Sequence, residues 1–412
     1  MKIRYLVLLF AVFVPVAQVM ALDPLWTAAG SSPVAITADG GYVLADGGIF
    51  SQYNRKGETV WRGYGGSSIQ ARGGEIFSPL KITRDGMYSI LGTNGGLLYI
   101  DRSQRIFWQD PQYRPIEDIA LSPDENYVAS IADGRLSVYT RGGELVWRNS
   151  TYSDVRFVDI SSGGLMTVAG SPDIIHAFNQ TGFELWNYTT PGIGEIVLSQ
   201  GNSDILASSD YTVICLHPSG NLLWRYYTGS EILDIGISGD GSTIAAGNQG
   251  GVVSVLDRDG KKIWSYKAGN WIYTVSLSGD GSLVATGGID RKILLFGKGG
   301  GLLWEYTTGG QVKDVAISAD GSALAAGAEM VYYFSLQGSP PSTTTAPQAT
   351  SPTQVTTGKP PSPPTRETVA RTPGPAISEP IPVETTPESG TESLAFIALA
   401  LGSVWFLVRK EK

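Results

Sequence analysis

Four acidic residues recur at one position of a repeated sequence unit, and they are the first candidates for chemistry. When the units are aligned on the Ser or Thr that ends the first strand of each, the residue four positions earlier is acidic in Asp118, Glu195, Asp234 and Asp314. Carboxylate oxygens are the ligands that Ca²⁺ prefers, so a partial acidic ring at these strand starts could bind a hard cation. The alternative is that each carboxylate accepts hydrogen bonds from its own interblade loop and so fixes one repeat against the next.

Two further charged residues stand two positions later in the same strand. Most units have a small residue there, as the packing of strands around an axis requires, in Ala35, Ala120, Gly236, Ser276 and Ala316. Lys81 and Asp159 break this pattern. Their proximity to the axis suits ligand binding, an ion pair or a solvated channel wall.

A group of aromatic residues lies outside the repeated pattern. Trp271 and Tyr273 stand in a connector between repeats, and Tyr226 and Tyr227 stand in the preceding connector. Exposed aromatic rings on rigid loops suit sugar rings or the anchor residues of a protein partner. The alternative interpretation is that these rings pack inside the fold.

One connector differs from its equivalents in length and composition. The segment Arg62–Ser78 is longer than the others, is rich in glycine, and carries Arg62 and Arg72. Because binding residues concentrate on loops held by a rigid scaffold, this connector is predicted to contact a partner.

Composition excludes several classes of site. The chain has 412 residues with 30 Lys and Arg against 38 Asp and Glu, a formal charge of −8 that gives no basic field for nucleic acid. Its one cysteine, Cys215, excludes intramolecular disulfides and Cys-rich metal sites, and Cys215 itself reads as a small buried hydrophobe. With only His176 and His217, neither at ligand spacing with a second ligand, we predict no metal site, no catalytic residue and no cofactor.

The elements that must position these residues are short strands in a repeat. Trp recurs at intervals of about 40 residues, at Trp26, Trp61, Trp108, Trp147, Trp186, Trp224, Trp264 and Trp304. The clearest unit predicts strands over 232–238, 243–247, 252–257 and 261–266, separated by Asp-Gly turns. Each Trp is predicted to pack an outer strand against the neighbouring unit.

Four strands at this period predict an all-β, eight-bladed β-propeller of four-stranded blades over residues 22–337. The first strands of the units start near Val34, Leu80, Ile119, Val158, Ile196, Ile235, Val275 and Val315. The eighth unit lacks a Trp strand, whereas the segment Leu22–Trp26 is a Trp strand without a unit. We therefore expect the N-terminal strand to close the ring, which leaves no sheet edge open. Seven blades would leave one unit outside, and an open solenoid is the other alternative.

The repeat resembles known families. A third strand, a Gly turn and then Leu or Ile before Trp is similar to PQQ-like propeller repeats, and the Ser-x-Asp-Gly turn resembles WD40-type units. The resemblance implies a propeller fold. Catalytic relatives bind pyrroloquinoline quinone with Ca²⁺, often over a vicinal disulfide, and use a general-base Asp, whereas non-catalytic relatives are protein-assembly scaffolds. This chain has no Cys-Cys pair and no long insertions of the enzyme type, so it matches the scaffolds.

The two ends of the chain indicate where the protein resides. Residues 1–21 have a basic start, an apolar stretch and a small-residue end, which predicts a signal peptide, with an N-terminal anchor as the alternative. Residues 338–392 hold more than half of the 23 prolines and many Ser and Thr, which predicts a disordered Pro/Ser/Thr-rich stalk. Residues 393–409 are apolar and precede the basic tail 410–412, which predicts a transmembrane anchor with a cytoplasmic tail.

The anchor is short for a bilayer, so it could also be a sorting tail that is later removed. It is similar to the C-terminal anchors of archaeal cell-surface proteins, although the Pro-Gly-Phe tripeptide of the commonest such signal is absent. The chain is thus expected at the cell surface with its propeller outside. Sequons at Asn149, Asn179 and Asn187 then become candidates for N-glycosylation.

Together these features predict a non-enzymatic, surface-tethered and monomeric propeller that binds a protein or an envelope glycan through its loop face. The alternative is an enzyme, either a quinone- or cation-dependent oxidoreductase or a lyase, that acts at the channel mouth. A lectin is the third candidate. Detection of cofactor absorbance or dye-linked dehydrogenase activity would favour the enzyme.

Overall fold

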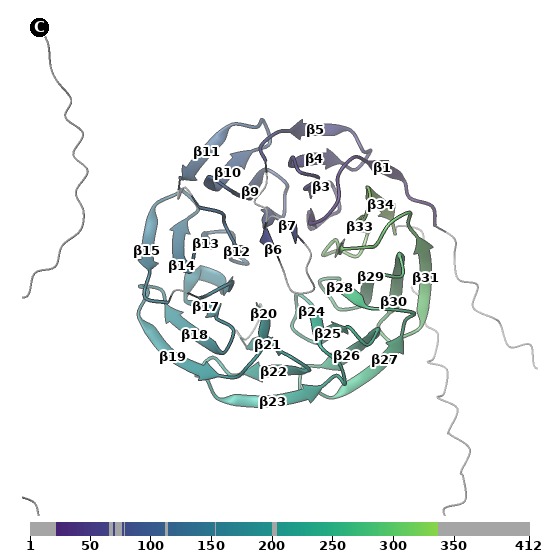
Figure 1. The fold of residues 1–412 in the computed structure, drawn as a ribbon. Helices are drawn as coiled ribbons and strands as arrows, with labels where there is room; N and C mark the ends of the chain where they lie inside the picture. The colour runs from purple at the N-terminus through teal and green to yellow at the C-terminus, as the bar shows by residue number, and fades with distance from the viewer. Residues whose placement is uncertain are drawn as a thin grey trace, which may run out of the picture. The chain divides into compact units, whose positions relative to one another are not determined.

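The computed structural model describes the ring-forming part of the chain, namely residues 22–65, 69–70, 76–77, 79–111, 114–152, 154–199 and 204–336. Within these residues eight four-stranded antiparallel sheets form a closed ring, which confirms the predicted eight-bladed propeller (Figure 1). The predicted signal peptide, stalk, anchor and basic tail lie outside the described residues. Among the residues described, no helix has the length and apolar character needed to cross a membrane.

Each blade runs outward from the axis, and its strands follow one another in the chain. The first strands, nearest the axis, are β2 (Val34–Ile36), β8 (Leu80–Ile82), β12 (Asp118–Leu121), β16 (Phe157–Ile160), β20 (Ile193–Leu198), β24 (Ile232–Ile237), β28 (Ile272–Leu277) and β32 (Asp314–Ile317). The second strands are β3 (Tyr42–Ala45), β9 (Tyr88–Thr93), β13 (Tyr127–Ala132), β17 (Met166–Gly170), β21 (Ile205–Ser209), β25 (Thr243–Asn248), β29 (Leu283–Gly288) and β33 (Ala323–Gly327).

The third and fourth strands complete the blades. The third strands are β4 (Ser51–Asn54), β10 (Gly96–Asp101), β14 (Arg135–Thr140), β18 (Ile174–Asn179), β22 (Thr212–Leu216), β26 (Val252–Asp257), β30 (Lys292–Gly297) and β34 (Val331–Ser335). The outer strands are β5 (Thr59–Arg62), β11 (Ile106–Asp110), β15 (Leu145–Asn149), β19 (Glu184–Thr189), β23 (Leu222–Tyr227), β27 (Lys262–Lys267), β31 (Leu302–Thr307) and β1 (Trp26–Ala28). We number the blades 1 to 8 in the order of their first strands.

The N-terminal strand closes the ring, as predicted. β1 pairs antiparallel with β34, and Trp26 lies opposite Tyr333. The two rings stack with centroids 5.1 Å apart and planes 3° from parallel. Blade 8 is therefore built from both ends of the propeller, so the ring is held shut by a sheet rather than by a loop.

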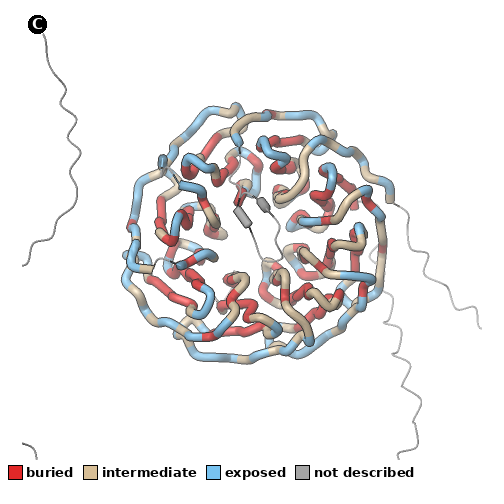
Figure 2. The backbone as a smooth tube through the Cα atoms, viewed as in Figure 1, coloured by how far each residue is buried: buried red, intermediate tan, exposed pale blue. Residues whose placement is uncertain are grey.

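The core consists of layers between neighbouring blades. Eight clusters of buried side chains occur in the described residues, and each cluster joins two adjacent blades. One example packs Leu206 and Val213 of blade 5 against Ile235 and Ile244 of blade 6. Figure 2 shows buried backbone concentrated within the blades and exposed backbone around the rim. Each blade thus buries its apolar surface only against its neighbours, as expected of a repeat architecture.

The Trp residues of the outer strands pack against turns of the neighbouring blade, which confirms their predicted role. The Trp264 ring lies over the turn of the next blade, and its Nε1 donates to the Lys298 carbonyl at 3.0 Å. That turn needs glycine, because Gly300 has φ +83° and a Cβ there would lie 2.6 Å from the Trp264 ring. Equivalent pairs occur around the ring, namely Trp26–Gly57, Trp108–Gly143, Trp147–Gly182, Trp186–Gly220 and Trp224–Gly260.

The turn after each first strand has a side-chain framework. In blade 6 the Ser238 hydroxyl donates to the Asp240 carboxylate at 2.6 Å and accepts the Thr243 backbone N–H at 3.0 Å. Burial opposes the charge on Asp240, but the hydrogen bonds that it accepts from the Ser238 hydroxyl and the Ser242 N–H lower its pKa overall. The same framework starts at Thr37, Thr83, Ser122, Ser278 and Ser318. The repeated Ser-x-Asp pattern is therefore explained by turn formation.

The strand order gives the ring two distinct faces. The connectors between blades and the hairpins between second and third strands lie on one face, which we call the connector face. The turns between first and second and between third and fourth strands lie on the other, which we call the turn face. The long connector adds the short pair β6 (Ile69–Gln70) and β7 (Ile76–Phe77), drawn inside the ring in Figure 1.

Candidate functional site

The predicted acidic residues line the axis, and each fastens its own blade to the next. The Asp118 carboxylate accepts the backbone N–H of Val158 in blade 4 at 2.8 Å. Asp314 does the same for Val34 across the ring closure. The equivalent distances are 2.9 Å for Glu195 and Ile235 and 2.7 Å for Asp234 and Val275. The sequence-based alternative placed the donors in the interblade loops, whereas these donors belong to the first strand of the next blade.

Asp159 has the same role, although its position in the repeat differs. Its carboxylate accepts the backbone N–H of Leu198 in blade 5 at 2.7 Å. In blade 7, Ser276 at the equivalent position accepts the N–H of Ile317 at 3.1 Å, and Thr274 accepts that of Val315 at 3.3 Å. Side chains two residues apart on a strand point to the same side, so either position can supply the acceptor.

These interblade hydrogen bonds occur at six of the eight interfaces in the described residues. The carboxyl groups that accept these hydrogen bonds are buried between the blades, and burial raises their pKa values. Burial raises the pKa of Asp118 to about 6, against the opposing effect of Lys81 and the accepted N–H groups. Burial likewise raises the pKa of Asp314 to about 7.

Glu195 and Asp234 form a coupled pair. Their side chains hydrogen-bond to each other, and burial together with the negative charge of Asp234 raises the pKa of Glu195 well above its usual value. A hydrogen bond between two carboxyl groups requires a proton. Burial also raises the pKa of Asp234, so the buried pair resists carrying two negative charges at once.

The geometry gives little support to a cation at this ring. In the part of the chain that the structure describes, no three His, Cys, Asp or Glu side chains lie close enough together to hold a metal ion. Asp118 and Asp159 each already accept two backbone N–H groups. The positive charge nearest to them is Lys81, which lowers the pKa of both against the larger effect of burial.

The predicted aromatic patch divides into separate pairs on the connector face. Trp271 and Tyr273 meet edge to face with centroids 6.2 Å apart, and both are half-buried. Tyr227 is 68% exposed and lies 6.4 Å from Tyr211 of its own blade. Tyr226 faces the other way and packs between blades 5 and 6. The connector placement expected from the sequence holds for Trp271 alone, since Tyr273 belongs to β28 and Tyr226 and Tyr227 end β23.

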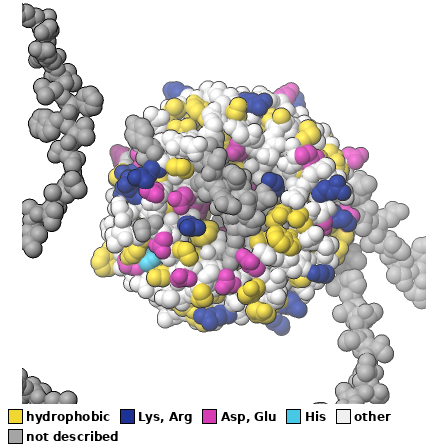
Figure 3. Space-filling view, in the orientation of Figure 1, with side chains coloured by type: hydrophobic (Ala, Val, Ile, Leu, Met, Phe, Trp, Pro, Cys, Tyr) yellow, Lys and Arg dark blue, Asp and Glu magenta, His cyan; other side chains and the backbone are white. Residues whose placement is uncertain are grey.

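The long connector begins at Arg62, one of its two predicted contact residues. Arg62 ends β5 and is exposed, and its carbonyl accepts the Gln104 side chain at 3.0 Å. Arg72 lies outside the described residues. Figure 3 shows acidic, basic and apolar side chains interspersed over one face of the ring rather than gathered by charge.

The three sequons are not equivalent. The side-chain oxygen of Asn179 accepts hydrogen bonds from Thr181 and Phe183 and so shapes a turn. Asn149 accepts the Thr151 N–H at 2.7 Å in a similar way. Asn187 lies on the exposed side of β19, where its amide contacts Glu184 at 3.4 Å. Asn187 is therefore the most accessible acceptor of the three.

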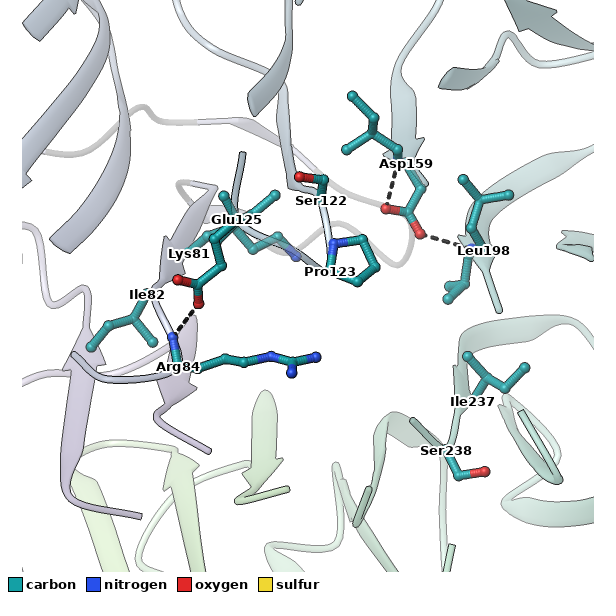
Figure 4. A pocket seen from close by; sticks show the side chains of 13 residues that line it. Lys81, Ile82, Arg84, Ser122, Pro123, Glu125, Asp159, Leu198, Ile237 and Ser238 are labelled. Carbon is teal, nitrogen blue, oxygen red and sulfur yellow. Dashed lines mark hydrogen bonds between the residues drawn. The ribbon is translucent and has the colours of Figure 1, made fainter. Parts of the chain in front are cut away.

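A cavity of about 300 Å³ opens at the axis toward the turn face (Figure 4). Its wall includes Lys81 and Arg84 of blade 2, Glu125 of blade 3 and Asp159 of blade 4. Aliphatic side chains of blades 2 to 6 form most of the remainder. The sequence had singled out Lys81 and Asp159, but nothing in its pattern indicated the cavity.

Sequence reasoning also missed a polar cluster at the rim of blade 4. Buried His176 contacts Glu184 through Nδ1 at 2.9 Å, and the Tyr152 hydroxyl donates to the same carboxylate at 2.5 Å. The centroids of the Tyr152 and His176 rings lie 4.1 Å apart.

Cys215 is buried, and burial raises the pKa of its thiol to about 12, in keeping with an inert thiol.

Comparisons with known proteins agree with the architecture. A family model described as outer membrane protein assembly factor BamB matches residues 132–337, half of the chain. No curated protein sequence matches. Among solved structures, the C-terminal WD40 domain of Sif2 superposes with a TM-score of 0.66 at 14% identity, over 78% of this chain and 99% of that one.

Two more structures show the same likeness. Sqt1 of Chaetomium thermophilum, solved bound to the N-terminus of ribosomal protein L10, gives a TM-score of 0.64 at 16% identity, over 76% of this chain and 100% of that one. The computationally designed Ika8 protein gives 0.63 at 18% identity, with 76% and 100% covered. At these identities the likeness shows the fold alone.

Proposed function

Since the chain belongs to the family of PQQ-like repeats described as outer membrane protein assembly factor BamB, we propose that it is a non-enzymatic scaffold, tethered to the cell surface, that binds another protein on its connector face. The family is described by a role in assembly, which favours a protein over a glycan as the partner. The expected signal peptide and the expected anchor at 393–409 are the basis for the tethering and for the external location.

One observation carries the proposal. The axial carboxylates are the groups whose pattern best suits chemistry, and they are committed to hydrogen bonds between blades. Asp118 accepts from Ile119 and Val158, and Asp159 accepts from Ile160 and Leu198. The oxygens of these acids face backbone N–H groups inside the blade interfaces, so they are poorly placed to contact a substrate as a general base.

The connector face offers the surface for binding. Tyr227 is largely exposed at the end of β23, and Trp271 of the next connector meets Tyr273 of β28 edge to face. Tyrosine and tryptophan are enriched among residues that dominate binding energy, because they bury much area at small entropic cost. Their position in or beside the connectors between rigid blades fixes their geometry before a partner arrives.

The test compares variants on the two faces of the full-length protein. Tyr227→Ala and Trp271→Ala should each abolish co-purification of the partner from crosslinked envelopes. Phe183→Ala is the matched control, because Phe183 is 70% exposed but lies in a turn on the opposite face. Retention of the partner by both connector variants would contradict the proposed surface.

A second measurement tests the non-enzymatic part. The purified protein is incubated with pyrroloquinoline quinone and Ca²⁺ and assayed for cofactor absorbance and dye-linked dehydrogenase activity. We expect neither signal, and either one would overturn the proposal. A glycan array probed with the same preparation separates a lectin from a protein-binding scaffold, since specific glycan binding lost in Trp271→Ala would replace the protein partner.

A further inference from the structure

The interblade hydrogen bonds at the axis have a gap around blade 2. Elsewhere a carboxylate or hydroxyl of one blade accepts a backbone N–H of the next, as Asp159 accepts Leu198 N–H at 2.7 Å. Blades 1 and 2 cannot supply such an acceptor from the equivalent positions, which are occupied by Pro33, Ala35, Pro79 and Lys81. Proline and alanine side chains have no acceptor, and a lysine ammonium is a donor only.

The axial cavity lies beside this gap. It is bounded on one side by Lys81, Ile82 and Arg84 and on the other by Leu121 of blade 3. Leu121 is the residue of blade 3 that corresponds to Leu198 of blade 5, whose N–H Asp159 accepts. Where blade 5 meets a carboxylate of its neighbour, blade 3 faces a position occupied by Lys81, beside an open volume of about 300 Å³.

The polar groups around the cavity favour a ligand that accepts hydrogen bonds. The Asp159 oxygens already accept two backbone N–H groups, and Glu125 accepts the Arg84 N–H at 2.5 Å. Lys81 and Arg84 are both exposed, and between them they carry eight N–H donors on two positive charges. In Figure 4 the Arg84 side chain extends across the opening toward the wall formed by Ile237 and Ser238.

The rest of the wall limits what such an acceptor can be. Six of the thirteen lining residues are aliphatic, among them Leu121, Ile160 and Leu198, so the wall suits a ligand that is partly apolar. Asp159 and Glu125 also line the cavity, and their negative charges disfavour a multiply charged anion such as a phosphate monoester. A single carboxylate on an aliphatic group satisfies both conditions.

We propose that this cavity binds one aliphatic carboxylate, with Lys81 as its ion-pair partner and Arg84 as a second donor at the opening. The ligand carboxylate takes the place that Asp159 fills at the interface between blades 4 and 5, next to the Leu121 backbone, and its aliphatic part contacts Ile160 and Leu198. The chemistry is that of a free short-chain acid or of the C-terminal residue of a polypeptide. This site is on the turn face and is independent of the connector face proposed above.

Calorimetry on the full-length protein tests the site with three probes. These are 4-methylpentanoate, the tripeptide Gly-Ala-Leu with a free C-terminus, and the same tripeptide amidated at its C-terminus. Both acids binding identifies a small-acid site, and the free peptide alone identifies the end of a partner chain; either result supports the proposal. Equal binding of the amidated peptide, or no binding of any probe, would overturn it.

Variants of Lys81 then locate the ligand. Loss of a hydrogen bond to a charged group should weaken binding by at least about tenfold in Lys81→Met. Lys81→Arg keeps the charge and should stay near the parent affinity. Lys261→Met is the control for loss of a lysine from an exposed turn of blade 6. If Lys81→Met misfolds, Val197→Phe narrows the cavity from blade 5 without altering charge and should also abolish binding. Unchanged affinity in a folded Lys81→Met or Val197→Phe protein would refute the assignment.

Discussion

The carboxyl group of Asp314 should make the stability of the ring depend on pH near neutrality. Asp314 accepts Val34 N–H at 2.8 Å across the closure between blades 8 and 1, and burial raises its pKa from 3.8 to about 7. Because the folded pKa lies above the unfolded value, the folded state binds the extra proton between these two pH values. The free energy of unfolding therefore falls as pH rises from about 4 to about 7.

The size of the effect follows from the two pKa values. Between pH 5.5 and pH 8.0 the unfolded carboxyl is ionised throughout, while the folded carboxyl loses its proton near the middle of the interval. Linkage then gives a loss of about 2 kcal/mol in the free energy of unfolding from this one group. Asp314→Asn keeps an oxygen that can accept the Val34 N–H, but it removes the titration.

Urea unfolding monitored by Trp fluorescence at the two pH values measures this difference. The parent should lose about 2 kcal/mol more than Asp314→Asn between pH 5.5 and pH 8.0. Asp320→Asn is the control, because hydrogen bonds to the Asp320 carboxylate outweigh its burial and lower its pKa. Its contribution is present above the unfolded pKa and is lost only in more acidic solution, so its effect in this window should be constant. A pH-independent difference between the parent and Asp314→Asn would refute the reasoning.

Three further expectations concern the ring as a whole. Trp26→Ala removes the half-buried indole that packs blade 8 and should lower the free energy of unfolding by about 2 kcal/mol. Leu25→Ala, at a side chain that is 59% exposed, should leave the free energy of unfolding almost unchanged in the same urea assay. Gly300→Ala places a Cβ 2.6 Å from the Trp264 ring at positive φ and should lower the melting temperature, while Gly299→Ala, with no atom within 4 Å, should not. Finally, EDTA and Ca²⁺ should each leave the melting temperature of the parent unchanged; a rise with Ca²⁺ would restore a cation at the acidic ring.

The sequence predicted the propeller well because every blade solves the same packing problem. A Trp on each outer strand recurs with the blade, six of these Trp rings lie over a Gly in the turn of the next blade, and the contact of Trp264 with Gly300 explains both residue types. Closure by the N-terminal strand was predictable for the same reason, since blade 8 lacked the Trp that Trp26 supplies. Contacts that repeat in every blade require the same residue types at the same spacing, so they can be predicted from the sequence.

The site was less predictable, because its contacts combine positions that the repeat keeps apart. Alignment placed Asp118 and Asp314 together, but it assigned Asp159 to a different position, although all three accept N–H groups from the next blade. The raised pKa of Glu195 depends on its side chain and that of Asp234 in the adjacent blade reaching each other. The Asp159-type contact recurs only at Ser276 of blade 7, with a different residue type, so it leaves no periodic pattern in the sequence.

Blade 2 departs from the repeat in several ways at once. Lys81 stands where other blades have a small residue or an acceptor, and the blade follows the longest connector. The Trp61 indole donates to Gln52 of its own blade at 2.6 Å instead of to the next turn, where Gln104 at φ +67° replaces the usual glycine. Departures from a locally consistent pattern tend to gather at functional sites, because selection for folding alone would remove them. Beside Lys81 the ring therefore lacks an interblade hydrogen bond that the other blades make, and the cavity lies next to this gap. In the proposed complex, a ligand carboxylate supplies the hydrogen-bond acceptor that the missing side chain would have provided.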